Sequence, residues 1–156
     1  MPLSPSDQNR LHNTAIADGR NGRIEGLPAD KVVFSTYQDK AIWGEDVTAL
    51  FSQFGNQHPG GTYIDIGANI GLTLVPLARH EAISFSLGIE ADPINAALLR
   101  HNLQQNNLPD VSVVEAAVFD TNTQLQFERD PVNAGDHRVR QAPREDALSM
   151  MDEAGR

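Results

Sequence analysis

The residues best suited to chemistry lie in one short stretch, Asp65 to Gly71, which reads D-x-G-x-N-x-G. Gly67 has no Cβ atom, so a bound molecule can come close to the backbone at that position. Glu90 follows about 20 residues after these glycines, the spacing at which an acidic side chain binds ribose hydroxyls in nucleotide-binding sheets. A glycine turn followed by a carboxylate at this spacing predicts a nucleoside-binding site.

The same stretch does not fit a phosphate-binding loop. Counted from Gly67, the dinucleotide pattern G-x-G-x-x-G requires glycines where this chain has Asn69 and Leu72, and G-x-x-x-x-G-K-[ST] is absent. A turn without phosphate handling suits an adenosine that carries a positively charged chain, such as S-adenosylmethionine. A fragment of a nicotinamide-dependent oxidoreductase remains an alternative, supported only by Glu90 and by the order of the elements around it.

Alternating strands and helices must position this turn. Strands are expected at Thr62–Ile66, Ile83–Ile89 and Val111–Ala117, and helices over 71–80 and from Asp92 to about Asn106. Asp92 can cap the second helix, and Pro93 suits its first position. This order predicts an α/β fold with a parallel βαβαβ unit, the first half of a Rossmann-like sheet.

Further elements are expected on both sides of that unit. Residues 1–30 are polar and without lasting periodicity, which predicts a flexible leader, and Lys31–Phe34 is a candidate for a short strand. Apolar residues spaced as on one face of a helix begin after Glu45. Another short strand is expected at Gln124–Glu128, and 141–156 is predicted to be a polar tail.

Three segments, in this order and spacing, resemble a known family. They are DIGANIGLTLVPLAR, GIEADPINAALLRHNLQQNN and VSVVEAAVFDTNTQLQFERDPVNAGDHRV, and GEDVTALF precedes them. Over roughly Val32 to Val139, the chain resembles the FkbM-type S-adenosylmethionine-dependent methyltransferases, which have a class I, Rossmann-like fold. The resemblance implies an enzyme that transfers a methyl group to a hydroxyl of a small molecule or a glycan.

The resemblance also implies which residues bind the cofactor. By it, the methionine and ribose end would be lined by Asp65, Gly67, Ala68, Asn69 and Gly71, and Glu90 would hold the ribose hydroxyls. Ala91 and Asp92 would border the adenine, and Glu115 with Ala116 would close its other side. No catalytic residue is identified.

Other side chains carry weaker signals. No two of the five histidines have metal-ligand spacing, so no metal site is expected. His137 lies in a loop that the resemblance places near the cofactor, and we expect a solvated side chain there. Trp43 and Tyr37 either pack under the leader or line an acceptor pocket.

The family pattern continues with a fourth strand that reads like IKIDVEG, which this sequence lacks. The prediction is therefore an incomplete methyltransferase domain over 31–140, without its C-terminal strands. The strand at 62–66 would then lie at an edge, with Tyr63, Ile64 and Ile66 facing water or a partner. We expect self-association through this edge unless residues 124–140 fold over it.

Composition narrows the classes of function. Among 156 residues there are 12 Lys and Arg against 21 Asp and Glu, a net charge of −9, and no cysteine. This balance argues against nucleic-acid and membrane binding, and the lack of cysteine excludes disulfides. Without an apolar run that spans a bilayer, a cytoplasmic protein is expected.

Two alternatives to the enzyme remain. The chain could be an inactive cofactor-binding module or partner subunit, or it could be a truncated coding sequence.

Overall fold

The computed structural model describes residues 3–123 and 125–140, and the predicted tail at 141–156 lies outside this range. The centre of the molecule follows the predicted βαβαβ order, which confirms the α/β class. Its elements are β3 (Gly61–Ile66), α4 (Leu74–Ala78), β4 (Ile83–Glu90), α5 (Pro93–Gln105) and β5 (Ser112–Glu115). The strands pair in parallel in the order β3-β4-β5, so β3 is an edge strand of the described sheet, as predicted.

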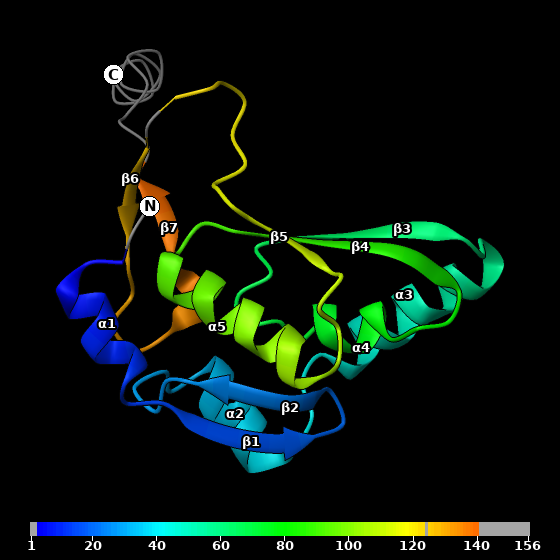
Figure 1. Ribbon diagram of the computed structural model, residues 1–156, viewed down its shortest axis with the longest axis horizontal. Coiled ribbons are helices and arrows are strands. Elements are labelled where there is room, and N and C mark those ends of the chain that lie inside the picture. Colours follow the sequence, from blue (N-terminus) through cyan, green and yellow to red (C-terminus); the bar gives the residue numbers. More distant parts are fainter. Residues whose placement is uncertain (1–2, 124, 141–156) are drawn as a thin grey trace, which may run out of the picture.

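Helices cover one face of this sheet. In Figure 1 the sheet lies along the top, with α5, α4 and α3 (Glu45–Gln57) below it. The residues of β4 that point toward the helices are Ser86, Gly88 and Glu90, and all three are buried. A Cβ atom at Gly88 would lie 2.7 Å from a leucine side chain of α4, so a glycine is needed for the helices to pack this closely.

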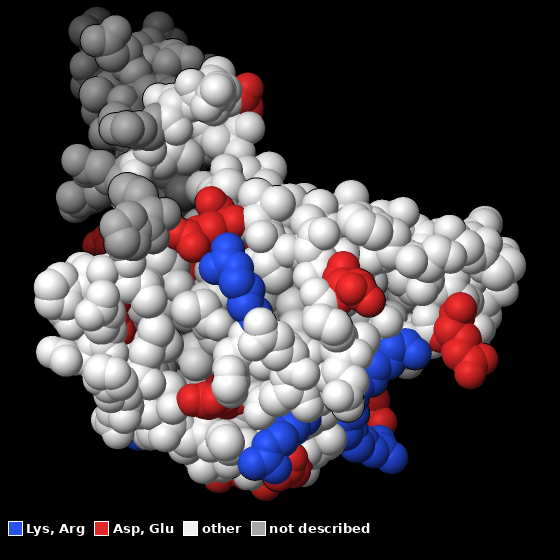
Figure 2. Space-filling view, in the orientation of Figure 1, with Lys and Arg blue, Asp and Glu red and all other residues white. Residues whose placement is uncertain are grey.

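The other face of the sheet is apolar and exposed in the described part of the chain. Ile64 and Ile66 are 51% and 63% exposed, and Val114 of β5 is also exposed. Few charged side chains are visible in Figure 2 at the end of the molecule formed by β3, β4 and α3. Exposure is thus confirmed for Ile64 and Ile66. Tyr63 corrects the prediction, because it is half-buried on the helix side, where its ring lies 5.3 Å from that of Phe51.

The first 30 residues form regular structure that packs into the core, contrary to the predicted flexible leader. They contain α1 (Pro5–Leu11) and an antiparallel hairpin of β1 (Ala15–Gly19) and β2 (Gly22–Gly26). Ile24 of β2 is fully buried in the same hydrophobic cluster as the leucines of α5. The hairpin lies on the side of α5 that faces away from the sheet (Figure 1).

Two buried asparagines, one in α5 and one directly after its last residue, bind the backbone of this hairpin. Asn102 accepts a hydrogen bond from the Glu25 N–H at 2.8 Å and donates to the Glu25 carbonyl at 3.0 Å. Asn106 accepts from the Arg23 N–H at 3.0 Å and donates to the Arg23 carbonyl at 2.6 Å. The two side chains thus give partners to part-buried backbone groups of β2.

The predicted strand at Lys31–Phe34 is wrong, because the chain forms helix α2 (Val33–Lys40) there. The Asp30 carboxylate accepts hydrogen bonds from the N–H groups of Val32, Val33 and Phe34 and so satisfies amides at the start of the helix. Helix α4 is shorter than the predicted 71–80, since the chain reaches helical geometry only at Leu74.

The C-terminal part of the described chain forms a second small hairpin. Strand β6 (Gln126–Glu128) pairs antiparallel with β7 (Arg138–Arg140), and the short 3-10 helix η1 (Ala134–Asp136) lies between them. The hairpin stands near α1 and the start of α5, at the opposite end of the molecule from α3 (Figure 1). This part of 124–140 therefore does not cover the edge of β3.

Candidate functional site

The turn after β3 opens toward a cleft at one glycine and packs tightly at the other. Gly67 has φ 82°, and apart from Gly67 and its two chain neighbours no residue comes within 4 Å of the position that a Cβ would take there. Gly71 has φ 94°, but its Cβ would lie 2.7 Å from Leu99 Cδ1 of α5. Gly67 is therefore placed to meet a ligand, whereas Gly71 allows the turn to pack against α5.

A cleft of about 380 Å³ lies at the carboxyl ends of β3 and β4. Ligands bind at these strand ends in open α/β sheets, and the volume is typical of pockets for small organic molecules. The cleft is lined by Val33, Trp43, Asp65, Ile66, Gly67, Ala68, Asn69, Leu72, Thr73, Ile89, Glu90, Ala91, Ala116, Ala117, Val118, Phe127, Ala134, Gly135 and His137.

The structure brings most of the predicted cofactor residues together in this cleft. Those that line it are Asp65, Gly67, Ala68, Asn69, Glu90, Ala91 and Ala116. Gly71, Asp92 and Glu115 do not. Asp92 caps α5 by accepting from the N–H groups of Ile94 and Asn95. Glu115 forms an ion pair with Arg100 at 3.3 Å.

Glu90 is held in a fixed orientation at the end of β4. It is 6% exposed, and its Oε1 and Oε2 accept from the N–H groups of Asp92 and Asn69, each at 2.8 Å. Burial raises the pKa of Glu90, although these two N–H groups act in the opposite direction. Each carboxylate oxygen keeps a second lone pair, so Glu90 can also accept hydrogen bonds from a ligand.

Asp65 places a second carboxylate in the cleft. Its Oδ2 atom is buried and has no hydrogen-bond partner among the described residues. Burial, together with the negative charge of Glu90, raises the pKa of Asp65 to about 6. A cation or a hydrogen-bond donor on a ligand would remove the cost of this unpaired acceptor.

The backbone N–H groups of the turn are already in use. Gly67 and Ala68 both donate to the Ile89 carbonyl, at 2.9 and 3.0 Å, and Asn69 donates to Glu90. A phosphate bound at such a turn takes its hydrogen bonds from these N–H groups. The site therefore presents acceptors to a ligand, which disfavours the pyrophosphate of a dinucleotide.

Two aromatic positions left open by the sequence are now resolved. Tyr37 is buried in the core, whereas Trp43 lines the cleft. The Trp43 backbone is bound by Asn21, which accepts from its N–H at 2.9 Å and donates to its carbonyl at 2.8 Å. Sequence reasoning missed Val33 and Phe127 as lining residues, because no motif links these positions to the turn.

His137 corrects the expectation of a solvated loop residue. Its side chain is 7% exposed and lines the cleft. The His137 Nε2 atom lies 3.2 Å from the Asp130 carbonyl, which can only accept, so Nε2 carries the proton. The other ring nitrogen, Nδ1, is buried without a hydrogen-bond partner in the described structure.

Residues 3–123 and 125–140 contain no group of three His, Asp or Glu side chains arranged to hold a metal ion. In the same residues, no helix is both long and apolar enough to cross a membrane.

No protein-family model and no curated protein sequence matches the chain. Solved structures resemble it weakly. TYW2 of M. jannaschii, solved in complex with AdoMet, is 18% identical, with 67% of this chain and 43% of that chain covered and a TM-score of 0.47. Trm5b from Pyrococcus abyssi is 18% identical, with 65% of this chain and 28% of that chain covered and a TM-score of 0.48. A methyltransferase from Geobacter sulfurreducens is 19% identical, with 54% of this chain and 44% of that chain covered and a TM-score of 0.42.

The chain thus spans less than half the length of these proteins. Likeness at this level assigns no activity, because one fold serves many functions.

Proposed function

We propose that the chain binds S-adenosylmethionine in the cleft and serves in methyl transfer. The observation that carries this proposal is the set of unused acceptors at Asp65 and Glu90 beside a turn whose N–H groups are already bonded. S-adenosylmethionine presents a sulfonium cation, an ammonium group and two ribose hydroxyls, which complement carboxylates. The open position at Gly67 leaves room for its approach to the backbone.

Each residue has a role in this proposal. Glu90 accepts hydrogen bonds from the ribose hydroxyls, and Asp65 faces the positively charged part of the ligand. Ala91 and Ala116 border the adenine with small side chains. When bound, S-adenosylmethionine would supply an activated methyl carbon, which passes to the acceptor oxygen as the carbon–sulfur bond breaks, S-adenosylhomocysteine leaves and the hydroxyl proton passes to water. The protein then contributes mainly orientation and the exclusion of water.

The acceptor is proposed from the resemblance to FkbM-type methyltransferases, which supports a hydroxyl on a small molecule or a glycan. A binding module without catalysis is the second candidate. Cofactor binding that persists without methyl transfer to any hydroxyl acceptor would identify this module.

Titration with S-adenosylhomocysteine tests the site. Trp43 is the only tryptophan of the chain and lines the cleft, so its fluorescence reports binding, with calorimetry as a second readout. We expect saturable binding by the wild type and at least about tenfold weaker binding by Glu90→Ala, because the loss of a charge-assisted hydrogen bond corresponds to about this factor in affinity. NAD should not bind.

Glu115→Ala is the matched control. Glu115 pairs in register with Glu90 on the neighbouring strand but lies outside the cleft, so this variant should bind like the wild type. A folded, monodisperse wild type that binds no S-adenosylhomocysteine would refute the proposal.

Self-association through the sheet is also proposed. Ile64 and Ile66 lie exposed on a strand at the edge of the described sheet, which supports it. Sedimentation velocity should show a concentration-dependent oligomer that Ile66→Lys reduces to monomer. A wild type that stays monomeric over a roughly 100-fold range of protein concentration, from micromolar upward, would contradict this proposal.

A further inference from the structure

We propose that Arg129 is a positioning residue for Glu90. It acts through Asp92 and through residues 129–137, the roof segment, to hold the Glu90 carboxylate toward the ribose of the ligand. This inference rests on the proposed function, because it takes Glu90 as the group that binds the ribose. Three sets of contacts carry it.

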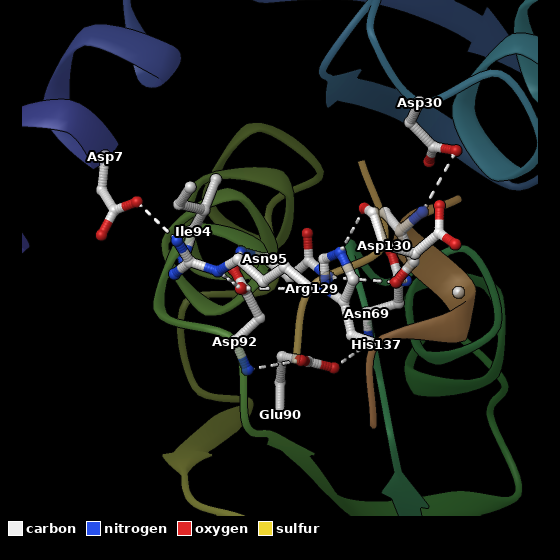
Figure 3. Close-up of polar contacts among 12 residues, drawn as sticks. Asp7, Asp30, Asn69, Glu90, Asp92, Ile94, Asn95, Arg129, Asp130 and His137 are labelled. Carbon is white, nitrogen blue, oxygen red and sulfur yellow. Dashed lines mark hydrogen bonds and ion pairs between the residues drawn. The ribbon is translucent and has the colours of Figure 1, made fainter. Parts of the chain in front are cut away.

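The first set fastens the roof segment to two helices. Arg129 Nη1 lies 2.7 Å from Asp7 Oδ1 on α1, and Arg129 Nε donates to Asp92 Oδ2 at the start of α5 (Figure 3). The Arg129 side chain is 30% exposed, and that of Asp92 is buried. Burial opposes ionisation of Asp7, but its hydrogen bonds from Arg129 and Ser4 lower its pKa overall. The guanidinium therefore joins two buried acidic side chains, each of which would lose a charged partner without it.

The second set leads from Asp92 to one oxygen of Glu90. Asp92 uses Oδ1 to cap α5 and Oδ2 to bind Arg129, so its side chain is held from two directions. Its backbone N–H donates to Glu90 Oε1 at 2.8 Å. The residue that binds Arg129 therefore also fixes half of the Glu90 carboxylate.

The third set leads from the roof segment to the other oxygen. Asn69 donates through its side-chain Nδ2 to the Ala134 carbonyl at 2.8 Å, and through its backbone N–H to Glu90 Oε2 at 2.8 Å (Figure 3). Asn69 has φ 49°, a left-handed backbone conformation that asparagine adopts more readily than other non-glycine residues. Both donors to Glu90 thus belong to residues that are tied to the roof segment.

The roof segment also forms part of the cleft wall, through Ala134, Gly135 and His137. If Arg129 is removed, the roof segment loses its ion pairs with Asp7 and Asp92, and Asp92 Oδ2 keeps only the more distant His137 Nδ1, at 3.7 Å, among its ion-pair partners in the described residues. The two N–H groups that orient Glu90 are then less well fixed. The effect should be specific to the ligand groups that Glu90 binds, namely the ribose hydroxyls.

This specificity separates positioning from a merely structural role. A structural loss weakens all ligands alike, whereas a loss of positioning at Glu90 lowers the preference for a ribose over a 2′-deoxyribose. The measurement is therefore the ratio of Kd values for 2′-deoxy-S-adenosylhomocysteine and S-adenosylhomocysteine. It is taken by Trp43 fluorescence, with circular dichroism to confirm folding.

Four proteins are compared: the full-length wild type, Arg129→Gln, Arg129→Lys and the control Arg100→Gln. Arg100 also pairs with a carboxylate, that of Glu115, but it does not line the cleft. We expect a ratio of about ten or more for the wild type and for Arg100→Gln. The ratio should fall to about two in Arg129→Gln. It should be intermediate in Arg129→Lys, since an ammonium group cannot span both carboxylates as a guanidinium does.

A folded Arg129→Gln protein that keeps the wild-type ratio overturns the inference, even if both affinities fall. If Arg129→Gln does not fold, Arg129→Lys decides in the same way. A wild type that binds S-adenosylhomocysteine but shows a ratio near one overturns the role of Glu90 toward ribose and this inference with it. A folded wild type that binds neither ligand refutes the proposed function itself.

Discussion

Replacing Asp65 by asparagine should stabilise the protein at neutral pH. Burial and the nearby charge of Glu90 raise the pKa of Asp65 from 3.8 to about 6. Below pH 3.8 the carboxyl is protonated in both the folded and the unfolded chain, so it costs nothing. Between pH 3.8 and 6 the unfolded chain ionises first, and the free energy of unfolding falls as pH rises. Above pH 6 the carboxyl is ionised in both the folded and the unfolded chain, and the free energy of unfolding stays lower by the full cost of the buried charge.

The size of the effect follows from the shift. Two pKa units correspond to about 3 kcal/mol, and asparagine, which is neutral at every pH, does not incur this cost. At pH 7.5 the free energy of unfolding of Asp65→Asn is therefore expected to exceed that of the wild type by up to about 3 kcal/mol. The two proteins should be nearly equal at pH 4. For a chain of this size the melting temperature at pH 7.5 should rise by up to about 10 °C.

Urea unfolding followed by far-ultraviolet circular dichroism, at pH 4, 5, 6 and 7.5, measures this difference. Asp110→Asn is the control, because Asp110 is exposed and should give the same small change at every pH. The reasoning is refuted if Asp65→Asn is no more stable than the wild type at pH 7.5, or if its advantage does not shrink toward pH 4.

Three further predictions concern the ligand and the core. The affinity for S-adenosylmethionine should rise up to about tenfold from pH 5 to pH 7 as Asp65 ionises, and calorimetry on Asp65→Asn should show no such rise. Gly71→Ala should lower the free energy of unfolding by about 3 kcal/mol, because of the positive φ and the contact with Leu99. Gly67→Ala should lower it by about 1 kcal/mol but prevent ligand binding. Equal effects of the two changes on the melting temperature would be contrary evidence. Asn102→Ala should cost about 3 kcal/mol, because part-buried backbone groups of Glu25 and the buried carbonyl of Ile70 lose their partner. A melting temperature within 2 °C of the wild type, roughly the effect of 1 kcal/mol, would contradict this.

The parallel core was predictable because its signals are local. Asp92 and Pro93 mark the start of α5 by capping and by backbone preference, and both act within one turn of helix. The alternation in β4 correctly predicts a strand. It does not reveal which side is covered, because the apolar residues such as Phe85 face outward while Gly88 faces the helices. That choice depends on the fit of α4 and α5 against a glycine.

The N-terminal segment was harder to interpret. Its hairpin has short strands around the loop of Arg20 and Asn21, and glycines on both sides hide the alternation. Its stability comes from α5, far away in the sequence. The same holds for the site. Glu90 and Asp65 follow from local pattern, whereas the backbone of Trp43 is held at the cleft by Asn21, which lies 22 residues earlier. An asparagine in a turn carries no sign of such a distant partner.

The attachment of the hairpin to α5 has a consequence for protein synthesis. The bonds that join β2 to Asn102 and Asn106 link residues 77 and 83 positions apart. At about 5 to 20 residues per second, the ribosome completes the hairpin roughly 4 to 16 s before α5 exists. A two-stranded hairpin alone is marginally stable in water, so Ile24 lacks its buried position in the core during this interval. The emergence of α5 from the ribosome therefore marks the earliest moment at which the first strands of the nascent chain can enter a folded protein.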